Sequence, residues 1–517
     1  MELIEKIEIS WRRVKADRRT DFIIGDFEYE VFDYYKNELL QGIVDNMLKQ
    51  EEYKPKSLRT IRVPKTSYTT RPGSVPEIED RIYYQYLVDE IADEIEEKLV
   101  PVEDRIVHSY RYNNNRTSSE MFLKGRASYT TFEGRTIEIS NDFKYVIVTD
   151  VSSYFERIYH HELENTLRGL GATPTIVESL CELLRKWRKG NSYSIPQGIW
   201  PSDYLGNIYL DPVDKFMMRK GYVYCRFVDD IRIGVNSYLE AQSVLLLLEE
   251  KLASLGLTLN DAKTKIIPSE QIEEILFPHK QRIEEIKDEI RSASNFSFNP
   301  YVDFEEEDAD DEDVDLTSAR ELFREQLSLE YPMPSITRFC LKHLNNFQDE
   351  EILEDVIKNL DRLVVVTPQV VGYLYSLYKI ADEQGKYYIS SSIASFIKDE
   401  LTNYDWQIMW FLQLMSKFKS IGTDEVNSIR EHIMNSNKEI HDAVLINALL
   451  LLGKHGDSAD YEWILSLFDK NYSSWVRQGI IYSLRNMPKT KRNHFYGYCI
   501  GQDTRIDKVI DFIKKKY

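Results

Sequence analysis

The sequence predicts an α+β chain, with a split βαββαβ sheet in its first half and an all-α domain after it. Two runs rich in β-branched and aromatic residues, 222–228 and 231–235, predict two strands joined by a tight turn at Asp229 and Asp230. A third apolar run, 145–149, predicts a buried strand that ends at Asp150. From about residue 318 to the end, apolar residues recur at helical spacing between short breaks.

A chain of 517 residues exceeds the size at which one hydrophobic core keeps growing, so several domains are expected. We predict a first domain at 1–270, a helix and acidic linker at 271–317, and a helical domain at 318–517. The linker contains ten carboxylates in the thirteen residues 303–315, which is most simply a solvated loop. The helical domain is expected to stack helix pairs in the manner of HEAT repeats.

Composition indicates a folded protein away from membranes. Hydrophobic residues make up 42% of the chain, the start is charged, and the longest apolar run, 443–452, is too short to span a bilayer. Four widely spaced cysteines have no zinc-binding spacing and predict reduced thiols in a cytoplasmic protein. A net charge of −20 excludes a protein coated in nucleic acid, so any nucleic acid should lie in a local groove. Two basic clusters are candidates for such a groove, or else ordinary solvated helix faces: Arg12, Arg13, Lys15, Arg18 and Arg19, and Arg185, Lys186, Arg188 and Lys189.

The elements of the first domain follow in a definite order. Residues 1–55 are mixed, with an aromatic-rich stretch at 27–35, and a Pro-Gly loop at 71–76 precedes a helix from Glu77. Lys65 and Arg71 beside this loop are candidates for binding phosphate oxygens, although such surface side chains commonly bind nothing. After Asp150 come a helix, a loop at 194–198 that feeds another helix, the strand–turn–strand at 222–235, a helix at 238–255 and a final strand. This order is the ferredoxin-like split sheet.

Three carboxylates are expected to converge at one edge of that sheet. Asp229 and Asp230 repel each other by several kcal/mol at low effective dielectric, so a positive charge should lie beside them. Together with Asp150 they form a hard-oxygen site suited to Mg²⁺ with substrate phosphates. The alternatives are an ordinary acidic hairpin turn and an Asp150 that only caps a helix.

Five motifs, in order, resemble those of a bacterial reverse transcriptase over roughly residues 55–268. They are the fingers residues Val63-Pro-Lys65, Arg71-Pro72, Asp80-Arg81 and Gln85; Asp150-Val-Ser-Ser-Tyr-Phe-Glu-Arg-Ile-Tyr-His160; Ser194-Ile-Pro-Gln-Gly198; Arg226-Phe-Val-Asp-Asp230; and Leu255-Gly-Leu-Thr-Leu-Asn-Asp-Ala-Lys-Thr264. Phe227 stands where the family usually has Tyr.

The resemblance implies a fingers and palm fold and a role for each motif residue. Asp150, Asp229 and Asp230, with the carbonyl of Val151, would hold two Mg²⁺ ions, with Mn²⁺ as a substitute, and Asp230 would act mainly as electrostatic support. The nucleotide-binding residues would be Lys65 and Arg71 on the phosphates, Lys263 near the leaving pyrophosphate, Phe155 against the sugar 2′ position, and Gln197 and Gly198 near the base or primer end. A ring at Phe155 implies a preference for deoxynucleotides.

The continuation after residue 270 has no Cys/His nuclease motif and no basic thumb. A reverse transcriptase core joined to a helical domain resembles the phage abortive-infection (Abi) reverse transcriptases, which include AbiK. That resemblance implies antiviral defence, homo-oligomers, and DNA made from dNTPs without a template on a tyrosine hydroxyl, leaving single-stranded DNA covalently attached to protein. The sequence has 34 tyrosines and does not identify the priming one; Tyr34, Tyr35 and Tyr517 are favoured only as peripheral residues.

Two alternatives remain open at the level of the sequence. One is a templated RNA-directed DNA polymerase, which the acidic balance and the missing basic thumb disfavour. The other is an inactive polymerase-like scaffold that binds partners through its helical domain, which the presence of all three carboxylates disfavours.

Overall fold

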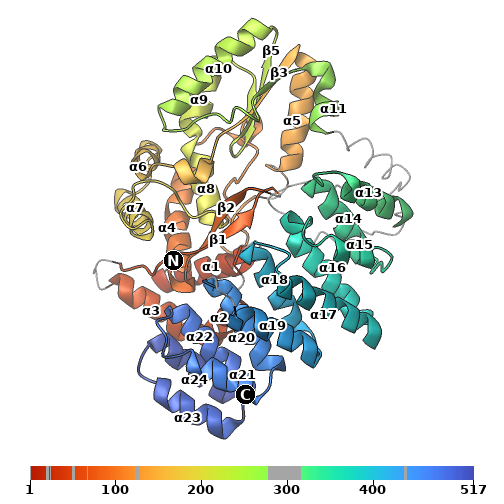
Figure 1. Cartoon of the computed structure of the whole chain (residues 1–517). Helices are drawn as coiled ribbons and strands as arrows, with labels where there is room; N and C mark the ends of the chain where they lie inside the picture. Colours follow the sequence, from red (N-terminus) through yellow and green to blue (C-terminus); the bar gives the residue numbers. More distant parts are fainter. Residues whose placement is uncertain are drawn as a thin grey trace. The chain divides into compact units, whose positions relative to one another are not determined.

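The computed structural model describes residues 2–18, 22–23, 25–48, 53–66, 68–123, 125, 127–277, 316–435 and 439–517, and these form two compact units (Figure 1). The first unit comprises Met1–Asp21, Asn37–Thr60 and Gly73–Val314, and the second comprises Phe22–Lys36, Ile61–Pro72 and Asp315–Tyr517. The predicted division is 1–270, 271–317 and 318–517, whereas these units are discontinuous in the chain, because Phe22–Lys36 and Ile61–Pro72 belong to the helical unit. The acidic stretch 303–315 and most of the helix expected near 271–292 lie outside the described residues.

A four-stranded antiparallel sheet forms the centre of the first unit. Its strands are β3 (Tyr145–Asp150), β4 (Tyr224–Phe227), β5 (Asp230–Val235) and β6 (Lys265–Pro268), in the order β4-β5-β3-β6. In the chain, β3 is separated from the β4–β5 hairpin by helices, and α10 (Tyr238–Ala253) connects β5 to β6. This is the predicted split βαββαβ topology, so that expectation is confirmed.

Helices cover the sheet closely. The sheet lies between α10 and α5 (Tyr129–Asp142) in Figure 1, and both helices contact β3 and β5. At Gly234 in β5, a Cβ atom would lie 2.4 Å from Cδ2 of Phe143, so glycine is what lets the end of α5 approach the strand. The central strand β3 is buried from Val146 to Asp150, as expected for a strand paired on both sides.

The remaining helices of the first unit are α1 (Leu3–Asp17), α3 (Lys36–Leu48), α4 (Ile78–Glu96), α6 (His160–Gly169), α7 (Pro174–Trp187), α8 (Trp200–Tyr209), α9 (Asp211–Arg219) and α11 (Ile272–Leu276).

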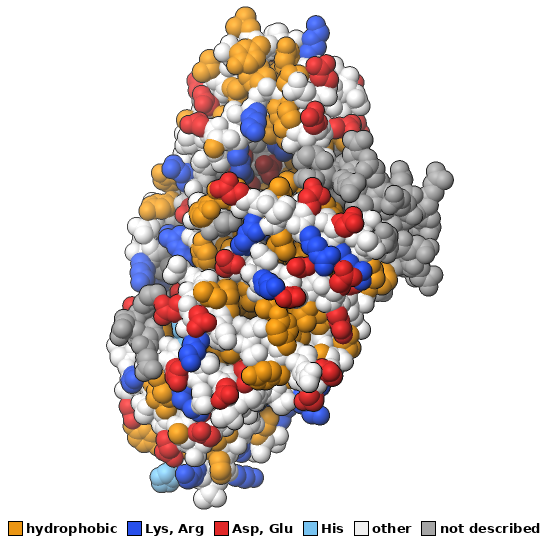
Figure 2. Space-filling view, turned by 45° about the vertical axis from the view of Figure 1, so that its right-hand side comes forward, with side chains coloured by type: hydrophobic (Ala, Val, Ile, Leu, Met, Phe, Trp, Pro, Cys, Tyr) orange, Lys and Arg blue, Asp and Glu red, His pale blue; other side chains and the backbone are white. Residues whose placement is uncertain are grey.

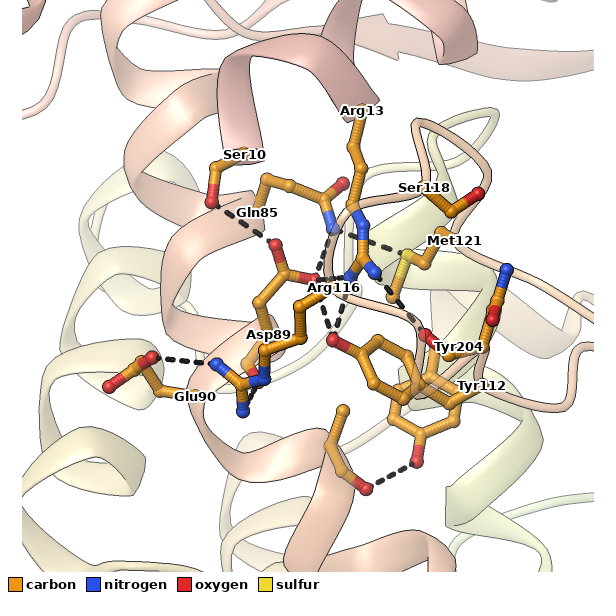
Figure 3. A network of polar contacts seen from close by, with 12 residues as sticks. Ser10, Arg13, Gln85, Asp89, Glu90, Tyr112, Arg116, Ser118, Met121 and Tyr204 are labelled. Atoms are coloured by element: carbon orange, nitrogen blue, oxygen red, sulfur yellow. Dashed lines mark hydrogen bonds and ion pairs between the residues drawn. The ribbon is translucent and has the colours of Figure 1, made fainter. Parts of the chain in front are cut away.

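A buried polar network joins α1 to α4 (Figure 3). Arg13 donates to Oδ1 of Asp89 at 2.6 Å and to the hydroxyl of Tyr112 at 2.6 Å, and Ser10 donates to Oδ2 of the same Asp89 at 3.1 Å. Gln85 completes the shell around this carboxylate with a 2.9 Å hydrogen bond. Arg13 is fully buried, so this member of the first basic cluster has a structural role.

The second unit is built mainly from two rows of helices. In the first row each helix packs on the next: α14 (Pro334–Asn346), α16 (Thr367–Ile380), α18 (Asp405–Lys417), α20 (Asp442–His455), α22 (Ser474–Ser483) and α24 (Thr504–Lys516). The second row contains α15 (Leu353–Lys358), α17 (Glu383–Lys398) and α19 (Thr423–Asn435). A Cβ atom at Gly453 would lie 2.1 Å from the carbonyl oxygen of Ser483, so glycine sets the close approach of α20 to the end of α22. The other helices of this unit are α2 (Asp26–Tyr34), α13 (Leu316–Ser328), α21 (Ser458–Ser466) and α23 (Lys489–Cys499).

The aromatic-rich stretch near the N-terminus belongs to this second unit. Helix α2 packs on α24, and the ring of Phe27 lies 5.2 Å from that of Tyr482. Tyr35 donates a short hydrogen bond to Asp511 in α24. Aromatic side chains on α2 are therefore buried against helices more than 400 residues later in the chain, which a local pattern does not reveal.

Two further expectations concern the environment of the protein. No helix of the described chain is long and apolar enough to cross a membrane. All four cysteines are buried and unpaired, and burial raises the pKa of Cys181, Cys225, Cys340 and Cys499 to about 12. These thiols are therefore held in their unreactive protonated form.

Candidate active site

The sheet brings Asp150 to the Asp229–Asp230 pair. Asp150 is the last residue of β3 and lies directly opposite Asp230, the first residue of β5, in the antiparallel register. Residues paired in this way have Cα atoms about 4.5–5.5 Å apart. Asp229 occupies the turn before β5, and its carboxyl group is near enough to Asp150 for the negative charge of Asp150 to raise its pKa. The three carboxylates predicted from the sequence therefore lie together at one end of the two central strands, β3 and β5.

The turn that carries Asp229 is held in a strained conformation. Val228, a β-branched residue, has a φ of 52°, in the left-handed region that such residues avoid. Both polar groups of its backbone are held by side chains: its N–H donates to Oγ of Ser109 at 2.9 Å, and its carbonyl accepts from Nη1 of Arg226 at 3.1 Å. These contacts fix the peptide that immediately precedes Asp229.

Arg226 anchors this turn to the helices behind it. Its guanidinium pairs with Asp214 of α9 through two hydrogen bonds of 2.6 and 2.7 Å, and it donates to Oδ1 of Asn207 of α8 at 2.8 Å. Ser109 donates to the same Asn207 oxygen at 2.9 Å, which closes the network. Burial alone would lower the pKa of Arg226, but the charge and hydrogen bonds of Asp214 raise it overall, so the guanidinium stays charged.

The sequence did not single out these supporting residues. One signal was available, because Arg226 is a charged residue inside a strand whose four residues are all buried. A buried cation requires a buried acid, but the sequence offers many acids, and only the fold brings Asp214 to it.

The negative charges of the three carboxylates act on one another. Burial, and then the charges of Asp150 and Asp230, raise the pKa of Asp229 well above the ordinary value of an aspartate. Lys263, from the segment before β6, forms a short ion pair with Oδ2 of Asp150. Burial lowers the pKa of Lys263, but the hydrogen bond and charge of Asp150 outweigh it and raise the pKa overall. The predicted positive partner is therefore this lysine.

The donor chemistry of the site fits a divalent cation. Among the described residues, no group of three or more His, Cys, Asp or Glu side chains is arranged to hold a metal ion. At Asp150, the ammonium of Lys263 pairs with one carboxylate oxygen. Burial and the negative charges of Asp150 and Asp230 raise the pKa of Asp229, so the three carboxylates lie close enough together to act on one another. Hard oxygen donors with excess negative charge suit Mg²⁺. The Val151 backbone lies beside them, bridged to Leu259.

Crowded carboxylates predict an unusual dependence of stability on pH. A carboxyl whose pKa is raised by folding stabilises the protein fully below its unfolded pKa of about 4, and this contribution is lost as pH rises through the folded pKa. Asp229→Asn, which cannot ionise, is therefore expected to have a higher Tm than the native chain at pH 8 in EDTA, with the difference disappearing near pH 4. Differential scanning fluorimetry across pH measures this, with exposed Asp261→Asn as the control. Equal profiles of Tm against pH for Asp229→Asn and the native chain would show that folding does not raise the pKa of Asp229.

The loop 194–198 lies against the segment that follows Asp150. Ile195 donates its backbone N–H to the carbonyl of Phe155 at 3.1 Å, and Ser194 donates to Ile158 at 2.8 Å. Gln197 accepts a hydrogen bond from the N–H of Ser74 at 3.2 Å, and Gly198 has a φ of 93°, which favours glycine. The structure thus places Phe155, Gln197 and Gly198 on connected segments after β3.

Phe155 packs on α8. A Cβ atom at Gly206 would lie 2.9 Å from Cε1 of the Phe155 ring, so glycine at this position makes room for the ring. The ring is partly exposed, and it lies edge-on to Tyr154 with centroids 5.5 Å apart. The Phe155 ring is therefore held by Gly206 and Tyr154, and the rest of the ring is exposed to solvent.

Lys65 and Arg71 are not placed with the carboxylates. They lie on the hairpin of β1 (Arg59–Pro64) and β2 (Thr70–Val75), in the segment Ile61–Pro72 of the second unit. Lys65 donates its backbone N–H to Thr69 at 2.8 Å, which closes the hairpin loop. The guanidinium of Arg71 lies 5.0 Å from the ring centroid of Phe22. Their part in phosphate binding stays a prediction.

Comparison with known proteins identifies the kind of domain. Residues 63–281 match the family described as reverse transcriptase (RNA-dependent DNA polymerase). The COX1/OXI3 intron 2 protein of Saccharomyces cerevisiae is 29% identical over 196 residues, which is 36% of this chain, and the match spans only 20% of the yeast protein.

Solved structures of telomerase also align with the chain. The one from Candida albicans with a TWJ fragment of telomeric RNA aligns over 74% of this chain and 62% of its own, at 11% identity and a TM-score of 0.31. The apo telomerase from Candida tropicalis aligns over 73% and 72%, at 12% identity and a TM-score of 0.31.

The family match covers the predicted motifs in the segment where the carboxylates meet. The chain therefore carries a reverse transcriptase domain, a nucleotidyltransferase domain that indicates nucleic-acid polymerase activity.

Proposed function

We propose that this protein is an antiphage-defence DNA polymerase of the abortive-infection type, which adds dNTPs to a tyrosine hydroxyl without a template. The observation that carries the polymerase part is the pairing of Asp150 with Asp230, with Asp229 beside them, inside the segment that matches reverse transcriptases. The acidic composition and the helical second unit support the untemplated form, because gripping a template relies on many phosphate contacts.

The chemistry is the transfer of a nucleotidyl group. A hydroxyl oxygen attacks the α-phosphorus of the dNTP, the new P–O bond forms, and the bond to pyrophosphate breaks. Asp150, Asp229 and Asp230, with the Val151 carbonyl, would hold two Mg²⁺ or Mn²⁺ ions, which acidify the attacking hydroxyl and neutralise charge on the triphosphate when bound. Lys263 places a cation beside Asp150, where it would stabilise charge developing on the pyrophosphate.

The residues around this centre would select the substrate. Gln197 and Gly198 would lie near the incoming base or the primer end, and Lys65 and Arg71 would bind phosphates. Phe155 would exclude a 2′-hydroxyl through its fixed ring. The rows of helices in the second unit are proposed to be HEAT-like and to support homo-oligomers in the cytoplasm.

Phe155→Ala is expected to admit ribonucleotides. Removal of the ring opens space at the sugar, so the ratio of kcat/KM for dNTP over rNTP should fall by about 10-fold or more. Single-nucleotide addition with dTTP and UTP measures this. Phe155→Tyr keeps the ring and should keep the preference; an unchanged ratio in Phe155→Ala would remove the assigned role.

The priming tyrosine remains open. The hydroxyl of Tyr35 is an unfavourable candidate as it stands, because burial and its hydrogen bond to Asp511 raise its pKa to about 12. Tyr34 and Tyr517 are about half exposed, at 52% and 45%. Peptide mass spectrometry for nucleotide-modified tyrosine after synthesis identifies the residue directly.

Synthesis without nucleic acid tests the proposal. Pure protein, freed of nucleic acid and incubated with Mg²⁺ and labelled dNTPs, should yield label that migrates with the protein and is sensitive to DNase. Label that requires an added RNA template and a nucleic-acid primer would instead support a templated RNA-directed DNA polymerase, which the description of the matched family favours. Unchanged phage protection in an Asp229→Ala, Asp230→Ala variant would support an inactive scaffold.

A further inference from the structure

A group of cations at the end of α7 has no acidic partners. Arg185, Arg188 and Lys189 form no ion pair with any residue whose placement is described, although most arginines of this unit pair with acids. Arg185 and Lys189 are exposed. The Nε atom of Arg188 is buried without a hydrogen-bond acceptor. In a chain of net charge −20, this is an unusual concentration of uncompensated positive charge.

A second segment adds two more cations to the same surface. The backbone carbonyl of Tyr53 accepts a short hydrogen bond from Lys186, next to Arg185. Tyr53 is fixed by its hydroxyl, which donates to Asp80 at 2.6 Å, and Lys56 donates its backbone N–H to the same carboxylate at 2.7 Å. The side chains of Lys54 and Lys56 are exposed and form no ion pair in the described part of the chain.

Among the residues whose placement is described, the acids beside this surface are already engaged. Glu182 pairs with Lys186 at 2.9 Å, and Asp80 accepts from Tyr53 and Lys56. Glu79 also faces Tyr53 and has contacts of its own. Elsewhere, on the face in Figure 2, basic and acidic side chains are interspersed.

Two exposed aromatic rings lie on segments that connect α7 and β3 to the loop 194–198. Tyr159 and Tyr193 are each 43% exposed, their ring centroids are 6.2 Å apart, and their backbones are bridged. Tyr193 follows Lys189 by four residues and immediately precedes the loop 194–198. Cys181 of α7 contacts the carbonyl of His160, the neighbour of Tyr159, at 4.0 Å through its Sγ, and the N–H of His160 donates to the carbonyl of Ser192 at 2.9 Å, so this pair lies beside α7.

We propose that this surface, defined by Lys54, Lys56, Arg185, Arg188 and Lys189 with Tyr159 and Tyr193, binds a single strand of nucleic acid next to the candidate active site. Cations that follow a backbone, together with exposed rings on which bases stack, form the usual site for single strands. Apart from Tyr159, the residues of this surface lie outside the motifs that carry the family resemblance. The role of the surface as a track for the product strand rests on the proposed function.

Equilibrium binding tests the surface without requiring catalysis. Fluorescence anisotropy of labelled oligo-dT on the full chain at 50 mM salt should show roughly 5- to 10-fold weaker binding for Arg185→Gln, Lys189→Gln, with the salt slope reduced by up to about 1.4. Lys54→Gln, Lys56→Gln should act in the same way. Arg219→Gln, Lys220→Gln removes the same two charges from exposed positions at the C-terminal end of α9 and should bind like the native chain.

The aromatic pair has a separate readout. Tyr193→Leu should weaken oligo-dT binding about 5-fold or more without changing the salt slope, since stacking carries no charge. An abasic oligonucleotide should bind the native and Tyr193→Leu proteins equally. Oligo-U in parallel shows whether the strand is DNA or RNA.

The outcomes separate this inference from the proposed function. If the variants of the surface and the control variant bind oligo-dT equally, the surface is not a nucleic-acid site, even when the native chain synthesises DNA. If the native chain binds oligo-dT through this surface but never incorporates dNTPs, the proposed function is wrong and the inference of a single-strand binding surface still holds. If duplex DNA binds as tightly as single strands and Tyr193→Leu has no effect, the surface is only a general polyanion site and the inference is overturned.

Discussion

Replacing Asp150 by Asn is expected to lower the rate of nucleotide addition on the order of 10³-fold or more, the scale seen when a residue acting on the reacting centre is removed. Asp150 is linked to each partner that defines the site: it lies opposite Asp230 in the sheet, its charge raises the pKa of Asp229, and it forms an ion pair with Lys263. Asparagine keeps the size of the side chain and one acceptor oxygen but removes its charge. Incorporation of labelled dNTP per enzyme measures the effect.

The control for this variant separates chemistry from folding. Asp150→Asn removes one of three repelling charges, so its Tm in EDTA should equal or exceed that of the native chain. Asp261→Asn, an exposed change nearby, should keep native activity. Activity within 10-fold of native for Asp150→Asn would show that this carboxylate does not act on the reacting phosphate.

Replacing Arg226 by Met is expected to destabilise the first unit by about 3–5 kcal/mol, because it leaves Asp214 as a buried, unpaired charge. Side chains of both residues are almost fully buried, at 1% and 2% exposure. Chemical denaturation measures the change. Arg105→Met breaks an ion pair whose side chains are 47% and 42% exposed, and should cost at most about 1 kcal/mol.

A second variant tests whether Arg226 also positions the turn. Arg226→Met with Asp214→Leu removes both charges and should recover much of the stability. It should not recover activity, because the Val228 carbonyl still lacks its donor and the peptide before Asp229 is no longer held. Native kcat in a stable double variant would show that Arg226 acts only on folding.

The topology could be predicted because each element has a local signal. The Asp-Asp turn lies between two β-branched runs and Asp150 ends a third, so the order of strands and helices follows from short-range pattern. The meeting of the carboxylates then follows from antiparallel pairing, in which the last residue of one strand faces the first of its neighbour.

The support for the site and the division into units could not be predicted in the same way. Arg226, Asp214, Asn207 and Ser109 come from four separate elements, and their network exists only after folding. The aromatic stretch at 27–35 has a helical pattern, but nothing local shows that Phe27 packs beside Tyr482.

Manganese titration tests the central claim most directly. Electron paramagnetic resonance of Mn²⁺ added to the full chain with dTTP should show ion binding that Mg²⁺ displaces. The signal of bound Mn²⁺ should be lost in an Asp150→Asn, Asp229→Asn variant and retained in Asp261→Asn. Undiminished Mn²⁺ binding in the double variant would mean that these carboxylates do not hold the metal, and the account of the site would be wrong.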